Sequence, residues 1–260
     1  CAISTSFGGE RKIRYWEPTW VLEQLDYLRN ERGVKNIKII DEMFVINPRH
    51  VNAICDGLIK KELGLNIWAY SRVETMRNMP LDKLKAAGFN WLCFGFEAAN
   101  DSIREAVIKG KFSRDDIYKV AEDCNSAGIN IIANYVFGFP DETWSSMEDT
   151  LKLAKEINSE FANFYCAMAY PGSKLYEEAL AAGLKLPDTW LGYSQHSYEC
   201  EPLPTKHLAA KEVLAFRDAA FKDYFSGTKY LEAIELKFGP DARFHIENMT
   251  KKELKRRLLS

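Results

Sequence analysis

Charged residues follow three short apolar runs of the chain, at the points where the runs end. Asp41 and Glu42 come after NIKII, Arg72 after NIWAYS, and Glu97 after NWLCFGF. Such residues could bind a polar ligand, or Glu97 and Asp41 could act as the acid and base of a lyase or aldolase. Each alone could equally be a solvated loop residue or a helix cap. Their shared placement favours one common site.

Two later apolar runs end in turns. Gly138 ends NIIANYVFG and is followed by FPDE, whereas Ala169 and Tyr170 end FANFYCAMAY and are followed by PGS. With the period of two of a strand, Asn134 and Gly138 share one face, opposite the more apolar face. A polar side chain in a central strand needs a partner. Asn134 could therefore face a bound polar ligand, or it could bond to a side chain of a neighbouring strand.

The apolar runs alternate with amphipathic segments along most of the chain. Strands are expected at 36–41, 66–72, 90–97, 129–138 and 161–169, separated by helices. This alternation predicts an α/β fold with a parallel sheet and right-handed crossovers. No glycine-rich turn follows the first run, which favours a barrel or partial barrel over a dinucleotide-binding sheet. In a barrel the residues that end the strands meet at one mouth.

The pattern changes after Gly183. Residues 184–204 are rich in proline and irregular, and 206–226 predict one long helix. We therefore expect a barrel core at 1–183 and a mainly helical C-terminal extension at 184–260. The formal net charge of −2 gives no sign of a nucleic-acid partner. No apolar run approaches the roughly 18 residues needed to span a bilayer.

The six cysteines are widely spaced, and Cys1 opens the chain. This spacing excludes a zinc ribbon and a dense disulfide framework, so we expect a cytoplasmic protein. His196, His207 and His245 have no metal-ligand spacing and are expected to be structural.

The ordered segments DEMF, SRVE, GFEAAND, NYVFGFPDE and AYPGSKLYEEA resemble the radical S-adenosylmethionine (radical SAM) superfamily, especially its cobalamin-binding subfamily. The resemblance covers about residues 1–182. Its more specific part is GFPDE followed, one strand-helix unit later, by PGSKLYE. It implies a partial (βα)6 TIM-like barrel whose first strand lies upstream of residue 1.

The superfamily has a CxxxCxxC loop whose three thiolates bind a [4Fe–4S] cluster. Only Cys1 can belong to such a loop in this sequence. The resemblance therefore implies that Cys1 is a metal ligand and a catalytic residue. It also implies that the chain is a fragment lacking the first two cluster cysteines.

The resemblance implies a SAM-binding role for the residues that end the strands. Asp41 and Glu42 would contact the methionine amino group. Arg72 would pair with the methionine carboxylate, although a surface salt bridge is the rival interpretation. Glu97 would accept hydrogen bonds from the ribose hydroxyls.

The adenosine part of SAM would be held further along the chain. The resemblance places Asn134 and Gly138 beside the adenosine. It assigns the adenine edge to backbone groups near Ala169 and Tyr170. A glycine at such a point lets the backbone approach the ligand.

The implied activity is reductive cleavage of SAM by the cluster, which generates a 5′-deoxyadenosyl radical. Cobalamin-dependent methyl transfer to an unactivated carbon ranks first. A radical SAM cyclase, a methylthiotransferase, a cluster-free barrel lyase and a non-catalytic scaffold stay open. The expected partners are a small-molecule or lipid substrate and an electron donor such as flavodoxin or ferredoxin.

Overall fold

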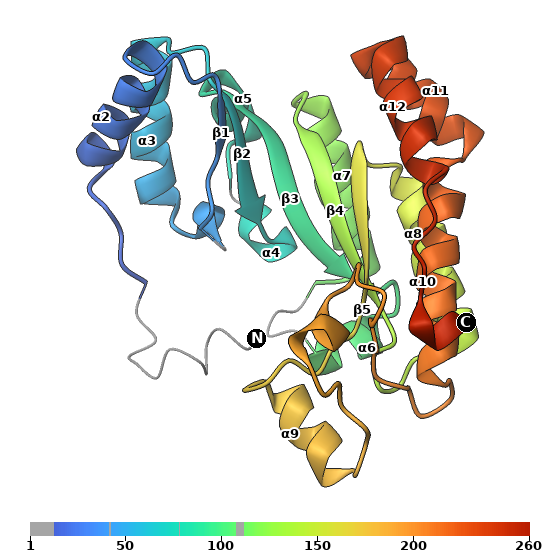
Figure 1. The fold of residues 1–260 in the computed structure, drawn as a ribbon. Helices are drawn as coiled ribbons and strands as arrows, with labels where there is room; N and C mark the ends of the chain where they lie inside the picture. Colours follow the sequence, from blue (N-terminus) through green and yellow to red (C-terminus); the bar gives the residue numbers. More distant parts are fainter. Residues whose placement is uncertain (1–12, 42, 78, 108–111) are drawn as a thin grey trace.

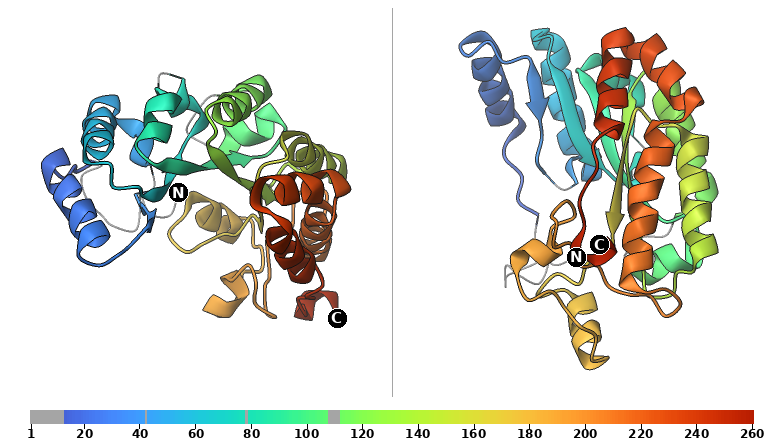
Figure 2. Two further views of the ribbon diagram at one scale, coloured as in Figure 1. Left: turned by 90° about the horizontal axis from the view of Figure 1, so that it is seen from above. Right: turned by 45° about the vertical axis from the view of Figure 1, so that its right-hand side comes forward.

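The computed structural model describes residues 13–41, 43–77, 79–107 and 112–260. Five strands form one sheet in chain order, and every neighbouring pair is parallel (Figure 1). They are β1 (Asn36–Lys38), β2 (Asn66–Ser71), β3 (Phe89–Glu97), β4 (Asn130–Phe137) and β5 (Phe161–Cys166). The sheet curves into a half barrel (Figure 2). The expected α/β partial barrel is confirmed.

Helices precede, connect and follow the strands. They are α2 (Pro18–Asn30), α3 (Pro48–Lys61), α4 (Val73–Met76), α5 (Leu81–Ala86), α6 (Asp101–Val107), α7 (Arg114–Ser126), α8 (Trp144–Ile157) and α9 (Lys174–Ala181). Two longer helices begin at a capping box, in which the side chain of the first residue bonds to the backbone of the first turn. Ser113 caps α7 and Thr143 caps α8 in this way. These caps fix where each helix starts.

The two faces of the sheet differ in their covering. On β4, Ala133, Tyr135 and Phe137 are buried beneath the helices, whereas Asn134 and Val136 on the opposite face are half-buried. The sheet's outer face is packed because α5, α7 and α8 lie against it (Figure 2). Its inner, concave face is the one that can receive a ligand.

The C-terminal segment contains α10 (Ala210–Phe225), α11 (Thr228–Phe238) and α12 (Pro240–Thr250). α10 packs on β5, where the Nε of Arg217 donates to the carbonyl oxygen of Phe164 at 2.7 Å. The side chain of Gln195 bonds to both backbone groups of Cys166. This segment therefore covers the outer side and edge of β5, while the division at residue 183 stays a prediction. Within the ranges given above, no helix is long and apolar enough to cross a membrane.

Candidate functional site

The carboxyl ends of the strands gather on the lower side of the half barrel in Figure 1. Glu97 ends β3 and Gly138 directly follows β4, while Asn134 lies within β4. Asn134 pairs with Gly95 on β3 and with Asn163 on β5 in the strand register. The topology thus brings these predicted residues to one region. Cys1 and Glu42 lie outside the described residues.

Glu97 has an unusual backbone for a non-glycine residue. Its φ is 60°, and the β3–β4 register shifts between Gly95 and Glu97. Bulges and left-handed backbone conformations cost free energy and occur often at binding sites. The bulge turns the Glu97 side chain over Gly95, where a Cβ would lie 2.2 Å from the carboxylate Oε1. The missing side chain at residue 95 therefore makes room for the Glu97 carboxylate.

The Glu97 carboxylate is half-buried, and no donor of the described residues forms a hydrogen bond with it. Burial raises its pKa to about 7, and the positive charge of Arg72 opposes that shift. A desolvated carboxylate without donors is expected to gain free energy from hydroxyl groups of a ligand. The ribose hydroxyls of SAM could donate the hydrogen bonds that this carboxylate lacks.

Asn134 is hydrogen-bonded to both neighbouring strands. Its Nδ2 donates to the Sγ of Cys93 and to the carbonyl oxygen of Phe94, each at 3.1 Å. Its Oδ1 accepts from the Nδ2 of Asn163 at 2.9 Å. The alternative of an Asn bonded to its neighbours is thus what the structure shows. Burial raises the pKa of the Cys93 thiol to about 11, so this thiol stays protonated at neutral pH.

Gly138 begins a turn that a buried carboxylate stabilises. The Oε2 of Glu142 accepts from the backbone N–H of Gly138 at 2.7 Å and of Phe139 at 3.0 Å. Glu142 is fully buried, and burial raises its pKa to about 7 against the effect of those two donors. Gly138 has φ of 86°, which favours glycine. Glu142 was not among the residues predicted from the sequence, although its position four residues after the glycine could have suggested a role.

Arg72 directly follows β2, and Asp41 lies three residues beyond the end of β1. The Nη2 of Arg72 forms an ion pair with the Oε1 of Glu74 at 2.7 Å, and its Nη1 donates to the Sδ of Met43 at 3.6 Å. Asp41 is exposed. A salt bridge was the other role that the sequence allowed for Arg72, and the structure contains one, with Glu74. A ligand carboxylate would have to replace Glu74 or add to it.

Ala169 and Tyr170 follow the last strand. The N–H of Tyr170 donates to Met168 and its carbonyl accepts from Ser173, so both backbone groups of Tyr170 are engaged. Ala169 is buried, and its own N–H and carbonyl form no hydrogen bond within the described part of the chain. Buried backbone groups are nearly always paired. The backbone of Ala169 is therefore able to bond to the polar edge of a bound base.

A metal site does not form among the described residues, where no group of three or more His, Cys, Asp or Glu side chains could bind an ion. The cluster prediction depends on Cys1 and is therefore a sequence-based expectation. Two residues do fit SAM itself: Glu97 offers an acceptor for hydroxyls, and Ala169 offers backbone groups for a base.

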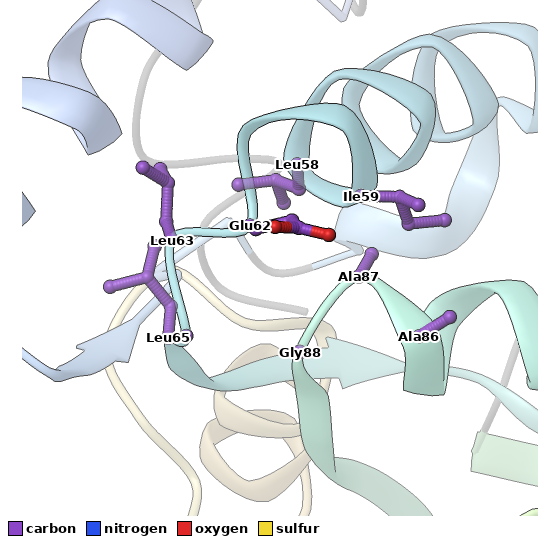
Figure 3. Close-up of a pocket in the computed structure, with 9 residues that line it drawn as sticks. Leu58, Ile59, Glu62, Leu63, Leu65, Ala86, Ala87 and Gly88 are labelled. Carbon is purple, nitrogen blue, oxygen red and sulfur yellow. The ribbon is translucent and has the colours of Figure 1, made fainter.

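A small pocket on the helix side of the sheet is unrelated to this site (Figure 3). It has a volume of about 350 Å³ and lies between the end of α3 and the turn after α5. Leu58, Leu63 and Ala87 are among its walls, and of the described residues that line it, Glu62 alone is charged. It lies at the amino ends of the strands, away from Glu97, and has no set of groups for catalysis.

The sequence matches the model of the radical SAM superfamily over residues 1–154. An uncharacterized methyltransferase from Pyrococcus horikoshii is 31% identical over 234 residues, which is 89% of this chain and 49% of that protein. A bacteriochlorophyllide d C-8(2)-methyltransferase from Chlorobaculum tepidum is 24% identical over 250 residues, covering 89% of this chain and 54% of that protein. The chain spans about half the length of these curated relatives.

A solved structure has a similar fold. The cobalamin-dependent radical SAM enzyme OxsB, with aqua-cobalamin bound, aligns with a TM-score of 0.58 and 14% identity. The alignment covers 92% of this chain and 42% of OxsB. At this identity the likeness concerns the fold, and it agrees with the five-stranded half barrel. The family match covers more than half of the chain, and the chain therefore belongs to the radical SAM superfamily.

Proposed function

We propose that the protein is a radical SAM enzyme that transfers a methyl group to an unactivated carbon with the help of cobalamin. The family match over residues 1–154 carries the proposal, because this range includes Asp41, Arg72, Glu97 and Gly138. Two relatives are named methyltransferases, which supports methyl transfer. OxsB, whose fold is similar, is described as cobalamin-dependent.

Glu97 is proposed to bind the ribose of SAM. Its carboxylate lies on the inner face and lacks hydrogen-bond donors among the described residues. Asn134 and Gly138 would flank the adenosine, and the backbone of Ala169 and Tyr170 would bond to the adenine edge. Asn134 would act as a wall, because its amide is already bonded to Cys93, Phe94 and Asn163.

The methionine end of SAM is assigned to the first two strands. Asp41 and Glu42 would bind the amino group, and Arg72 would bind the carboxylate. Arg72 is charged and rests against Glu74 and Met43, so its guanidinium is held near the end of β2. Charge-assisted contacts of this kind would orient the sulfonium end of SAM without taking part in bond breaking.

Cys1 is proposed as one of three thiolate ligands of a [4Fe–4S] cluster. When bound, the cluster and SAM supply the one-electron reduction and the radical chemistry. The chain's own contribution is to bind SAM, to fix its orientation and to exclude water from the inner face. The helices α5, α7 and α8 pack on the outer face of the sheet and leave its concave side for the ligand (Figure 2).

The remaining assignments also belong to this proposal. The substrate would be a small molecule or a lipid, the electron donor would be a flavodoxin or ferredoxin, and the location would be the cytoplasm. Residues 1–183 would form the radical SAM core and 184–260 the helical extension.

The proposal is tested with the full-length protein, reconstituted with iron and sulfide without oxygen. The protein is incubated with SAM, cobalamin and a strong reductant, and the products are measured by mass spectrometry. A cobalamin-dependent methyltransferase should release both 5′-deoxyadenosine and S-adenosylhomocysteine. A cyclase should release 5′-deoxyadenosine without S-adenosylhomocysteine, and a cluster-free lyase should leave SAM intact. Either of the last two results would contradict methyl transfer.

A further inference from the structure

A second hollow lies on the sheet at the opposite, amino ends of the strands. It has a volume of about 740 Å³, within the range of ligand pockets. α11 and α12 form its far wall beside the amino end of the sheet (Figure 1). We call it the aromatic groove and define it by Trp68, Trp91, Ile132 and Phe161 of the sheet with Ile234 and Phe238 of α11.

The walls of the aromatic groove are flat and rigid. Trp91 stacks on Phe238 with ring centroids 5.7 Å apart and planes 13° from parallel. Trp68 touches Tyr70 edge to face at 4.6 Å, which fixes the plane of the indole. Aromatic walls favour flat apolar ligands, because ring faces stack with ring faces over a large contact area. The lining thus selects a conjugated or polycyclic molecule over a flexible polar one.

One cation lies at the rim of the aromatic groove. The Nζ of Lys38 is 4.0 Å from the centre of the Trp68 ring, and it forms no ion pair with a carboxylate of the described residues. The acidic residue on the opposite side, Glu160, is already engaged by Lys237 and by the N–H of Ile131. The groove therefore offers an available positive charge beside an apolar wall, which suits a ligand with an acidic group.

The aromatic groove shares the inner face with the proposed SAM site. Trp91, Cys93 and Gly95 lie on that face by the alternation of β3, and the bulge places the Glu97 carboxylate over Gly95. At about 3.3 Å per residue, Trp91 and Glu97 are roughly 20 Å apart along the strand. A ligand in the groove could reach a SAM-derived radical only if it were long enough to cover most of that distance.

We propose that the aromatic groove binds the flat apolar body of the substrate, a conjugated or polycyclic carboxylic acid, with Lys38 pairing to its carboxylate. The proposal rests on the proposed function, because it assumes that the inner face is where the substrate reacts. The groove would be a specificity site, since it binds a part of the molecule remote from the reacting carbon.

The test uses 1-pyrenebutyrate as the probe and 1-pyrenebutanol as its neutral match. Binding to the full-length reconstituted protein is measured by anaerobic equilibrium dialysis without SAM or reductant. Ala242, which also lines the groove from α12, is changed in Ala242→Trp to fill the space. Lys38→Gln removes the charge, and Lys35→Gln is the matched control, because Lys35 is exposed and does not line the groove.

We expect saturable binding of both probes. Ala242→Trp should weaken both by more than tenfold, while Lys38→Gln should weaken only the carboxylate, by about fivefold, as for a partly exposed charge pair. Lys35→Gln should change neither. An absence of saturable binding, or equal effects of the two lysine variants, would overturn the proposal.

Two further measurements show whether the variants are folded and whether a second copy of the chain covers the groove. SAM affinity should be unchanged in Lys38→Gln, which shows that this exposed variant is folded even if Ala242→Trp is not. A dimer that binds no probe and dissociates in Ala242→Trp would show that a second copy covers the groove, and would overturn the proposal. Because neither SAM nor reductant is present, failure of probe binding is distinct from failure to cleave SAM.

Discussion

The carboxylate of Glu97 lies against the bare Cα of Gly95, two residues earlier on β3. A Cβ at residue 95 would come within 2.2 Å of the Glu97 Oε1 and 3.2 Å of its Cδ. The atoms in the way belong to the far end of a flexible side chain, so an added methyl would move the carboxylate rather than the backbone. A substitution at residue 95 can therefore shift the Glu97 carboxylate with little effect on the stability of the sheet.

Gly95→Ala should therefore reduce SAM affinity more than it reduces stability. We expect affinity to fall by about tenfold, since one displaced hydrogen-bond acceptor for a ligand is worth about 1–1.5 kcal/mol. The free energy of unfolding should change by less than about 1 kcal/mol. Anaerobic SAM titration and urea unfolding measure the two effects. Gly227→Ala, with an ordinary backbone and far from the site, is the control. Unchanged SAM affinity in Gly95→Ala would contradict this account.

SAM affinity should depend on pH through Glu97. Burial raises the pKa of this carboxyl to about 7, so the ionised form that accepts two hydroxyl donors becomes available as pH rises through that value. We expect tighter SAM binding at pH 8 than at pH 6, by roughly threefold to tenfold. Glu97→Gln should bind more weakly at both values and lose that dependence. A dependence that persists in Glu97→Gln would assign the titration to another group.

Protein stability should depend on pH through Glu142. Burial raises its pKa from 4.5 to about 7, so the folded state binds more protons than the unfolded state across that window. Stability is therefore lost as pH rises from about 4.5 to 7, by roughly 1–3 kcal/mol from this group. Glu142→Gln keeps an acceptor for Gly138 and Phe139 and should lack this loss. Urea unfolding at pH 5 and pH 8 measures it. Equal pH slopes in both proteins would contradict the prediction.

Gly138→Ala should destabilise the turn after β4. Gly138 has φ of 86°, and an added Cβ would lie 2.4 Å from the Cγ1 of Val213 on α10. We expect a loss of about 1–3 kcal/mol, from backbone strain and from the clash. In Gly138→Ala/Val213→Ala the clash is removed but the strain is not, so the two changes should cost less together than the sum of their separate effects. Strict additivity of the two changes would show that α10 does not press on this turn.

The order of elements was predictable from the sequence because local patterns determine it. Apolar runs of period two and helical stripes gave all five strands of the described sheet in the right places. Strand ends were less accurate. β1 was expected at 36–41 but ends at Lys38, and β5 was expected to reach 169 but ends at Cys166. Both are edge strands of the described sheet, so they have a neighbour on one side only. A strand's extent depends on its partners, which its own residues do not specify.

The candidate site was predictable where it follows from topology. Parallel strands share a carboxyl edge, so Arg72, Glu97 and Gly138 could be grouped from their positions alone. The contacts that these side chains form could not be predicted in this way. The bond from Asn134 to Cys93 joins residues 41 positions apart. The aromatic groove could not be predicted either, because it needs α11 to pack over Trp91, and a helix far along the chain does not specify its strand partner.

We propose that SAM is bound and cleaved at the carboxyl ends of the strands. The most direct test is the amount of 5′-deoxyadenosine released by the reduced, cluster-loaded full-length protein, compared with its Glu97→Ala and Cys1→Ala variants. We predict release by the native protein, release reduced by at least tenfold at limiting SAM in Glu97→Ala, and none in Cys1→Ala. The account would be contradicted if the native protein released none, or if both variants released as much as the native protein.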